Sequence, residues 1–188
     1  MNTQVYFIRH SKSDFSIKDD RTRPLTMEGI EHSIELAKIF EDIKIDYIYS
    51  SPYKRVIQTI EPIVKYKNME IITINNFRER KIGEKWIDNF LEFSKEQWKD
   101  FSYKLSDGES LIEVQERNIK ELEKILLKNN GKSIIIGTHG TALSTIINYY
   151  DKSFNFENFL EIVDIMPYII KFEFSNKRYI GREEIKII

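Results

Sequence analysis

Two of the chain's three histidines follow apolar runs that are typical of buried β-strands. His10 comes directly after Arg9 and the apolar run 5–8, and His139 comes directly after the apolar run 133–137 and Thr138. Open α/β sheets bind their ligands at the carboxyl ends of parallel strands, so we expect both imidazoles at one sheet edge. An arginine beside an imidazole at such an edge indicates phosphate chemistry on a histidine.

This chemistry makes definite demands on the residues around the nucleophile. The attacking ring nitrogen needs a free lone pair, and a hydrogen bond to the other nitrogen must fix the tautomer. The phosphoryl oxygens need positive charge, and arginine forks bind two of them at once. Arg55 stands one turn into a predicted helix whose amino terminus adds N–H groups and a positive dipole end. At His139 an imidazolium could bind the transferring group, and Gly140 lets the backbone approach closely.

The elements that must position these residues are predicted from periodicity and capping signals. We expect helices that follow Thr26, Ser51, Glu109 and His139, and the motif Ser51-Pro52 predicts a capping hydroxyl followed by proline at the first helical position. Strands are expected at 5–8, 45–49, 71–74 and 133–137, with an edge hairpin formed by 168–174 and 178–188. This order predicts an α/β fold with a mostly parallel sheet.

Composition excludes several classes of protein. A chain of 188 residues that is 41% hydrophobic and 31% charged fits one globular domain, and its net charge of −1 attracts neither nucleic acid nor an anionic membrane. The chain has no cysteine, which rules out disulfides and a Cys-x5-Arg phosphatase; three histidines are too few for a two-metal phosphatase. No Gly-rich nucleotide loop, export signal or membrane-spanning run is present, so we expect a cytoplasmic protein.

Six motifs in the same order resemble those of the histidine phosphatase superfamily, also called the phosphoglycerate mutase-like family. Any one of them is weak evidence, and the shared order over most of the chain carries the resemblance. They are Phe7-Ile8-Arg9-His10, Arg23-Pro24-Leu25-Thr26-Met27-Glu28-Gly29, Ser50-Ser51-Pro52-Tyr53-Lys54-Arg55 with Gln58-Thr59, Phe77-Arg78-Glu79-Arg80-Lys81-Ile82-Gly83, Gly108-Glu109-Ser110 and Thr138-His139-Gly140.

The resemblance implies a three-layer α/β/α sandwich: a single domain over 1–188 with a small helical cap around 84–107. It implies that His10 is the nucleophile that becomes phosphorylated, and that Glu79 is the general acid and then the base for water. The residues it implies for substrate binding are Arg9, Arg55, His139, Gly140, Ser13 and Ser16. No metal or organic cofactor is implied, since the arginines supply the electrostatic stabilisation.

Two departures from the family pattern concern the loop after His10. Ser11 stands where the family has glycine, and Lys12-Ser13 stands where it has Glu-Thr. Ser16 aligns with the family's phosphate-contacting asparagine. We therefore expect this loop to fit a substrate different from that of the mutases.

Some of these residues also fit a structural or surface role without any part in catalysis. Glu79 has Arg78, Arg80 and Lys81 as neighbours and would also fit an ordinary charged surface cluster. His32 carries no motif and is interpreted as structural or exposed. Arg117 and Glu109 are expected on a helix surface, or behind the site, rather than in catalysis.

Three functions remain open on the sequence. The leading hypothesis is a phosphatase that hydrolyses a phosphomonoester through phosphohistidine at His10. The second is phosphoglycerate mutase-type phosphoryl transfer, which the compact chain disfavours. The third is a regulatory protein that binds phosphate without catalysis. The expected partner is a small phosphorylated molecule, with a phosphoprotein as an alternative; the sequence indicates neither the substrate nor the oligomeric state.

Overall fold

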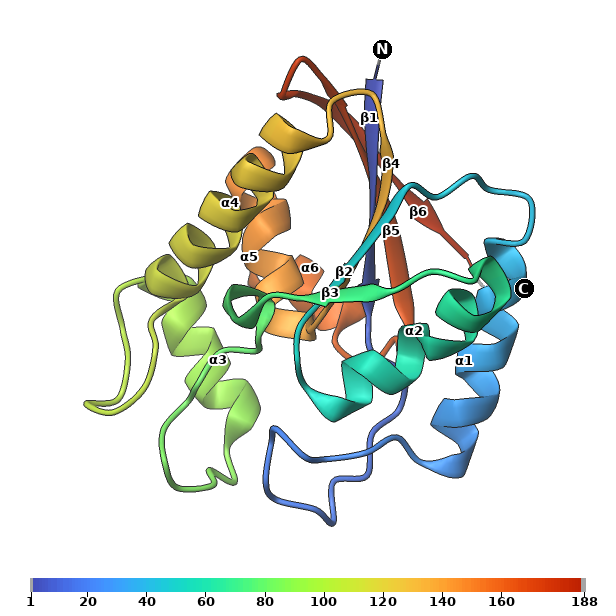
Figure 1. The fold of residues 1–188 in the computed structure, drawn as a ribbon. Coiled ribbons are helices and arrows are strands. Elements are labelled where there is room, and N and C mark those ends of the chain that lie inside the picture. Colours follow the sequence, from blue (N-terminus) through green and yellow to red (C-terminus); the bar gives the residue numbers. More distant parts are fainter. Residues whose placement is uncertain (1, 187–188) are drawn as a thin grey trace.

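The computed structural model describes residues 2–186, which contain a six-stranded sheet between two layers of helices (Figure 1). The strands are β1 (Asn2–Arg9), β2 (Tyr47–Ser50), β3 (Ile71–Thr73), β4 (Ser133–Thr138), β5 (Tyr168–Ser175) and β6 (Arg178–Ile185). The helices are α1 (Met27–Ile39), α2 (Lys54–Lys67), α3 (Phe90–Lys99), α4 (Leu111–Lys128), α5 (Gly140–Tyr150) and α6 (Phe156–Ile162), with a short 3-10 helix, η1, at Asn75–Phe77.

The sheet is mostly parallel. Its strand order is β3-β2-β4-β1-β5-β6, and β1, β2, β3 and β4 run in the same direction. β5 lies antiparallel to β1, and β6 continues the sheet as the edge of an antiparallel hairpin. Because β1 and β4 are adjacent and parallel, their carboxyl ends meet: Arg9 is paired with Thr138. This register brings His10 and His139 to the same edge.

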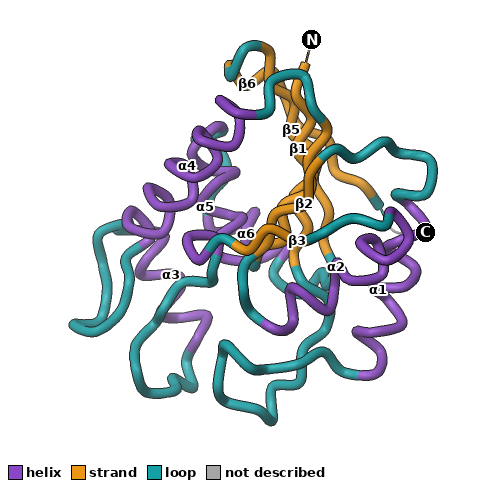
Figure 2. The backbone as a smooth tube through the Cα atoms, viewed as in Figure 1, coloured by secondary structure: helices purple, strands orange, loops and turns teal. Residues whose placement is uncertain are grey.

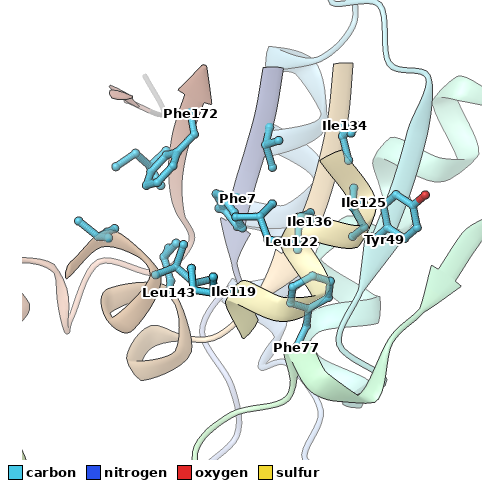
Figure 3. Close-up of a cluster of buried hydrophobic side chains, with 14 of the residues drawn as sticks. Phe7, Tyr49, Phe77, Ile119, Leu122, Ile125, Ile134, Ile136, Leu143 and Phe172 are labelled. Atoms are coloured by element: carbon cyan, nitrogen blue, oxygen red, sulfur yellow. The ribbon is translucent and has the colours of Figure 1, made fainter. Parts of the chain in front are cut away.

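Each face of the sheet carries its own apolar core. On β1, Val5 and Phe7 face the core beneath α4, α5 and α6, whereas Tyr6 and Ile8 face the core beneath α1 and α2. Figure 3 shows the first of these clusters, where Phe7 lies among side chains from the helices and neighbouring strands. Such strands, buried on both faces, explain the continuous apolar runs of the sequence.

Local signals set the helix ends that frame the site. Thr26 caps α1, its hydroxyl accepting from the Gly29 amide at 3.0 Å. Ser110 caps α4 in a reciprocal box with Glu113. The β5–β6 turn uses positive φ angles at Asn176 and Lys177, a geometry whose twist matches the hairpin strands.

The structure corrects two predicted boundaries. α2 begins at Lys54 rather than at Ser51-Pro52, because the Ser51 amide still bonds the Gly137 carbonyl of β4 at 2.9 Å. The predicted strand 178–188 ends at Ile185 as β6, and residues 187–188 lie outside the described part of the chain. The segment 84–107 contains the single helix α3.

One helix was missed from the sequence. α6 is seven residues long, and Asn155 and Asn158 form its capping box. Its aromatic residues show no sustained helical period, so the sequence pattern did not indicate it. Within residues 2–186, no helix is both long enough and apolar enough to cross a membrane.

The loops that carry the site gather at one edge of the molecule. In Figure 2 the loop after β1 and the loop before α3 both lie at the lower edge of the sheet. Their contact is direct, since Lys18 Nζ lies 4.0 Å from the centroid of the Trp86 ring.

Candidate active site

His10 is the first residue beyond β1, and its tautomer follows from one hydrogen bond. Ring Nδ1 lies 2.8 Å from the Ser11 carbonyl oxygen. A carbonyl only accepts, so Nδ1 carries the proton and Nε2 carries the lone pair. The hydrogen bonds of the described residues leave Nε2 without a partner. Burial, and then the charges of Arg55 and Arg9, lower the pKa of His10 well below 6.5. His10 is therefore neutral at pH 7, as a nucleophile requires.

His139 holds the opposite tautomer. Arg55 Nη2 donates to its Nδ1 at 3.1 Å, so Nε2 carries the proton and donates to Ser51 Oγ at 2.8 Å. Its ring centroid lies 5.4 Å from that of His10. Burial, and then the charge of Arg55, lower the pKa of His139 well below 6.5. In this arrangement the ring of His139 is neutral, whereas the sequence suggested an imidazolium that binds the transferring group.

Arg9 is held from behind by the missed helix. Its Nη1 donates to the carbonyl oxygens of Ile162, at 2.7 Å, and Ile165, at 3.2 Å. Burial lowers the pKa of Arg9 to about 10, so it remains a cation at neutral pH. Its Nε is buried and has no partner within residues 2–186. A Cβ at Gly140 would lie 3.1 Å from Arg9 Cζ, so a glycine leaves room for the guanidinium there.

Arg55 contacts a carboxylate of this chain. Its Nη2 lies 3.1 Å from Asp20 Oδ1, and its Nη1 donates to the Asp20 carbonyl. Arg23 Nη1 donates to the same Oδ1 at 3.0 Å, so Asp20 bridges two guanidinium groups. Arg55 Nε is buried without a partner in the described part of the chain. The Asp20 carboxylate accepts from Arg55 in the way that any oxyanion would.

The Glu79 carboxyl group lies at the amino terminus of α5, the helix that begins directly after His139. Its Oε1 accepts from the amides of Ala142, at 3.0 Å, and Arg80, at 2.8 Å. Its Oε2 accepts from the Thr141 amide at 3.1 Å. The carboxyl group is thus fixed by three N–H donors at the same edge as the imidazoles.

The neighbours of Glu79 do not form a solvated charge cluster. Arg80 is 4% exposed, donates to Gln97 and packs against Phe93 with its guanidinium 5.4 Å from the ring centroid. Arg78 pairs with the half-buried Glu109 at 2.5 Å. The surface interpretation of this segment therefore describes neither Arg80 nor Arg78.

The predicted serines lie on the loop after His10, in different surroundings. Ser13 is buried, pairs with Leu25 in an isolated β-bridge, and has a buried hydroxyl with no partner among the described residues. Ser16 is exposed, and its amide and hydroxyl both bond Asp14 Oδ1, at 2.9 and 2.7 Å. The structure brings together Arg9, His10, Arg55, Glu79, His139 and Gly140, whereas the contacts of Ser16 stay within its own turn.

Sequence reasoning missed three supporting groups. Thr59 Oγ1 accepts from the Ser11 amide at 2.9 Å and so fixes the loop just beyond the nucleophile. Ser51 Oγ accepts from His139 Nε2 and does not cap the start of α2. Thr59 and Ser51 both stand inside quoted motifs, which could have indicated them, whereas no sequence signal distinguishes Asp20. Across residues 2–186, no group of three His, Asp or Glu side chains is placed to hold a metal ion.

The chain is an α/β protein with a mostly parallel sheet, and two imidazoles and two buried arginines lie at the carboxyl ends of its parallel strands. The sequence profile of the histidine phosphatase superfamily (branch 1) matches residues 5–163 of this chain. The chain is therefore a member of that superfamily. Members of the superfamily include phosphatases and mutases, and the relatives carry both names.

Two curated relatives illustrate this range. The chain is 27% identical over 150 residues to the "Uncharacterized phosphatase PhoE" of Bacillus subtilis, covering 77% of this chain and 76% of that protein. It is 26% identical over 158 residues to the "Probable phosphoglycerate mutase GpmB" of Shigella dysenteriae, covering 77% and 73%.

Solved structures share the fold. YhfR of Bacillus stearothermophilus superposes with a TM-score of 0.77 at 21% identity, covering 94% of both chains. A phosphoglycerate mutase of Bacillus anthracis gives 0.74 at 18% identity, covering 98% of this chain and 92% of that one. These likenesses establish the phosphoglycerate mutase-like architecture.

Proposed function

We propose that the protein is a phosphatase that hydrolyses a phosphomonoester through a phosphohistidine at His10. The observation that carries this proposal is the state of His10: a neutral, buried ring whose unpartnered Nε2 lies beside two cationic guanidinium groups. The buried Nε atoms of Arg9 and Arg55 lack acceptors in the described chain, and leaving such donors unpaired costs about 1–3 kcal/mol each. Phosphoryl oxygens would satisfy both.

The first half-reaction transfers the phosphoryl group to the enzyme. His10 Nε2 attacks phosphorus, the bond from phosphorus to the ester oxygen breaks, and the electron pair leaves with that oxygen. Glu79 carries the proton that it took from water in the preceding turnover, and it gives this proton to the leaving oxygen, which departs as an alcohol. Arg9 and Arg55 stabilise the charge on the remaining phosphoryl oxygens. The His139 Nε2–H, which donates to Ser51 in this structure, becomes a further donor when a phosphoryl oxygen replaces the Ser51 hydroxyl as its acceptor.

The second half-reaction restores the enzyme. Glu79, now a carboxylate, takes a proton from a water molecule, and the hydroxide oxygen that remains attacks phosphorus. The N–P bond breaks, its electron pair returns to His10 Nε2, and inorganic phosphate leaves. Every step uses side chains of this chain, so we expect turnover to persist in a chelator.

A test is hydrolysis of p-nitrophenyl phosphate in EDTA, with acid-quenched and alkali-quenched samples taken during turnover. We expect an acid-labile, alkali-stable phosphoenzyme in the wild type, and a loss of about a thousandfold or more in kcat for His10→Ala. His32→Ala is the matched control, because His32 lies on α1 away from this edge. Unchanged turnover in His10→Ala would contradict the proposal.

A second candidate, phosphoryl transfer of the mutase type, is favoured by the similarity to the relative named as a probable mutase. It uses the same phosphohistidine but returns the phosphoryl group to a bound acceptor. Dependence of turnover on a bisphosphorylated primer would favour it. Tight vanadate binding without turnover, in either assay, would instead indicate a regulatory pocket.

A further inference from the structure

The segment that carries Glu79 is irregular, yet one arginine binds it at three points. Arg117, on α4, donates through Nη1 to the carbonyl oxygens of Asn76, at 2.6 Å, and Arg78, at 2.9 Å. Its Nη2 donates to the carbonyl oxygen of Glu79 itself at 3.1 Å. Only 11% of the Arg117 side chain is exposed. A planar guanidinium with several donors in fixed directions constrains the backbone that it contacts.

Glu109 completes this contact from the other side. Its carboxylate takes a fork from Arg117, with Nε to Oε1 at 2.9 Å and Nη2 to Oε2 at 3.1 Å. The same carboxylate accepts from the Lys81 amide at 2.9 Å and from Arg78 Nη2. The Glu109 amide in turn donates to the Lys81 carbonyl at 2.7 Å. The segment 76–81 is therefore hydrogen-bonded on both sides of Glu79.

We call these contacts of Arg117 and Glu109 with the segment 76–81 the clamp. The residues that form it stand at and just after the start of α4. A Cβ on Gly108 would lie 2.1 Å from the Ile82 carbonyl oxygen, so only glycine allows the two backbones this close. Ser110 then caps the helix, and Arg117 follows two turns later on the side that faces the segment. The motif Gly108-Glu109-Ser110 thus has a physical role: close approach, acceptor and cap.

The charges of the clamp persist at neutral pH. Burial alone would raise the pKa of Glu109, but the hydrogen bonds from Arg117 and the Lys81 amide outweigh it, and the pKa lies below 4.5. Burial lowers the pKa of Arg117, and its contact with Glu109 opposes that change. The pair therefore remains ionic in the pH range in which a phosphatase would work.

We propose that Arg117 and Glu109 are positioning residues for Glu79: they fix the backbone of 76–81 so that its carboxyl group stays at the amino terminus of α5, where it protonates the leaving oxygen. The inference rests on the proposed function and deepens it. Of the two places expected for Arg117 and Glu109, it favours the one behind the site over the helix surface.

A double-mutant cycle over Arg117 and Glu79 tests the proposal. Substrates are p-nitrophenyl phosphate, whose leaving group needs little protonation, and an alkyl phosphate, whose leaving group needs much. General acid catalysis contributes about 10²- to 10⁴-fold, so we expect Arg117→Ala to lower kcat/KM by about tenfold or more for the alkyl phosphate and by less than about threefold for the aryl phosphate. In a Glu79→Gln background the loss for the alkyl phosphate should vanish.

The controls separate positioning from mere stability. Arg117→Lys should restore part of the alkyl phosphate rate, since an ammonium still reaches one carbonyl. Lys120→Ala, on the exposed face of α4, should leave both rates unchanged. If Arg117→Ala does not fold, Arg117→Lys and Glu109→Gln carry the test, with thermal melting run for each. Equal losses on both substrates, or additive losses in the double variant, would overturn the proposal.

A readout that does not need turnover distinguishes this inference from the proposed function. The amides of Thr141 and Ala142 bind Glu79, so their ¹H–¹⁵N signals report its position. We expect Arg117→Ala and Glu79→Gln to shift both signals, and Lys120→Ala to leave them in place. Unmoved signals in Arg117→Ala would overturn the clamp, whereas moved signals in a protein without turnover would leave the clamp standing and remove the phosphatase.

Discussion

The two imidazoles are neutral but carry their protons on different nitrogens. In His10 the Nδ1–H group donates a hydrogen bond to the Ser11 carbonyl, and in His139 the Nε2–H group donates one to Ser51 Oγ. Each partner accepts from only one side of its ring, so the backbone and Arg55 select the tautomers. The result is a lone pair on His10 Nε2 and a proton on His139 Nε2, from two residues of the same type.

The contact between Gly140 and Arg9 gives a prediction at the same scale. In Gly140→Ala the new Cβ would lie 3.1 Å from Arg9 Cζ and Nε, while two carbonyl bonds hold the guanidinium from behind. We expect displacement of Arg9 and a rise in KM of about tenfold, equivalent to about 1.4 kcal/mol. Gly181→Ala is the control, because nothing lies within 4 Å of its Cβ position. Steady-state kinetics that do not distinguish the two variants would count against this role of Arg9.

The loop between β1 and α1 carries Asp20, which accepts from Arg55. It is anchored where the Thr26 amide bonds the Lys12 carbonyl at 3.0 Å, and it reaches Trp86 through Lys18 and Arg23. Between these contacts it delivers Asp20 to Arg55. A phosphate that bound Arg55 would therefore replace Asp20 as an acceptor on the guanidinium.

Removal of this internal competitor should tighten anion binding. For Asp20→Ala we expect the inhibition constant of vanadate or phosphate to fall several-fold, since Arg55 and Arg23 lose their shared acceptor. Asp42→Ala makes the same charge change at an exposed site and is the matched control. Inhibition titrations with p-nitrophenyl phosphate measure both. A weaker or unchanged constant in Asp20→Ala would show that Asp20 does not compete with phosphate.

The helices differ in how far local sequence predicts them. α1 and α4 carry capping residues, and both begin close to their predicted starts. α6 is too short to show a period, yet its last carbonyls hold Arg9. The start of α2 was predicted too early, because the tertiary contact of Ser51 with β4 extends the sheet by one residue.

At the scale of the whole molecule, burial of neutral histidines links stability to pH. The pKa values of His10 and His139 are lowered well below 6.5 in the folded protein, so below that pH the unfolded chain binds protons that the folded one does not. Stability should therefore fall as pH drops below 6.5. The contribution from these two rings is constant above that value.

Thermal melts across pH test this linkage. We expect the melting temperature of the wild type to decline below pH 6.5, and to decline less steeply in a His10→Gln, His139→Gln double variant. His32→Gln controls for the loss of an imidazole outside the site. Identical slopes in the wild type and the double variant would show that the two rings take up protons in the folded state.

The sequence by itself determined the strand order in the chain, the mostly parallel α/β class and the placement of His10 and His139 at strand ends. Periodicity, caps and turns act over a few residues, so a single sequence displays them. Only the tertiary structure decided the tautomers, the bridge from Asp20 to Arg55 and the clamp on Glu79. Arg117 lies 38 positions from Glu79, and Arg9 lies 153 positions from Ile162. Contacts at such separations depend on how the helices pack against the sheet, and no local pattern records them.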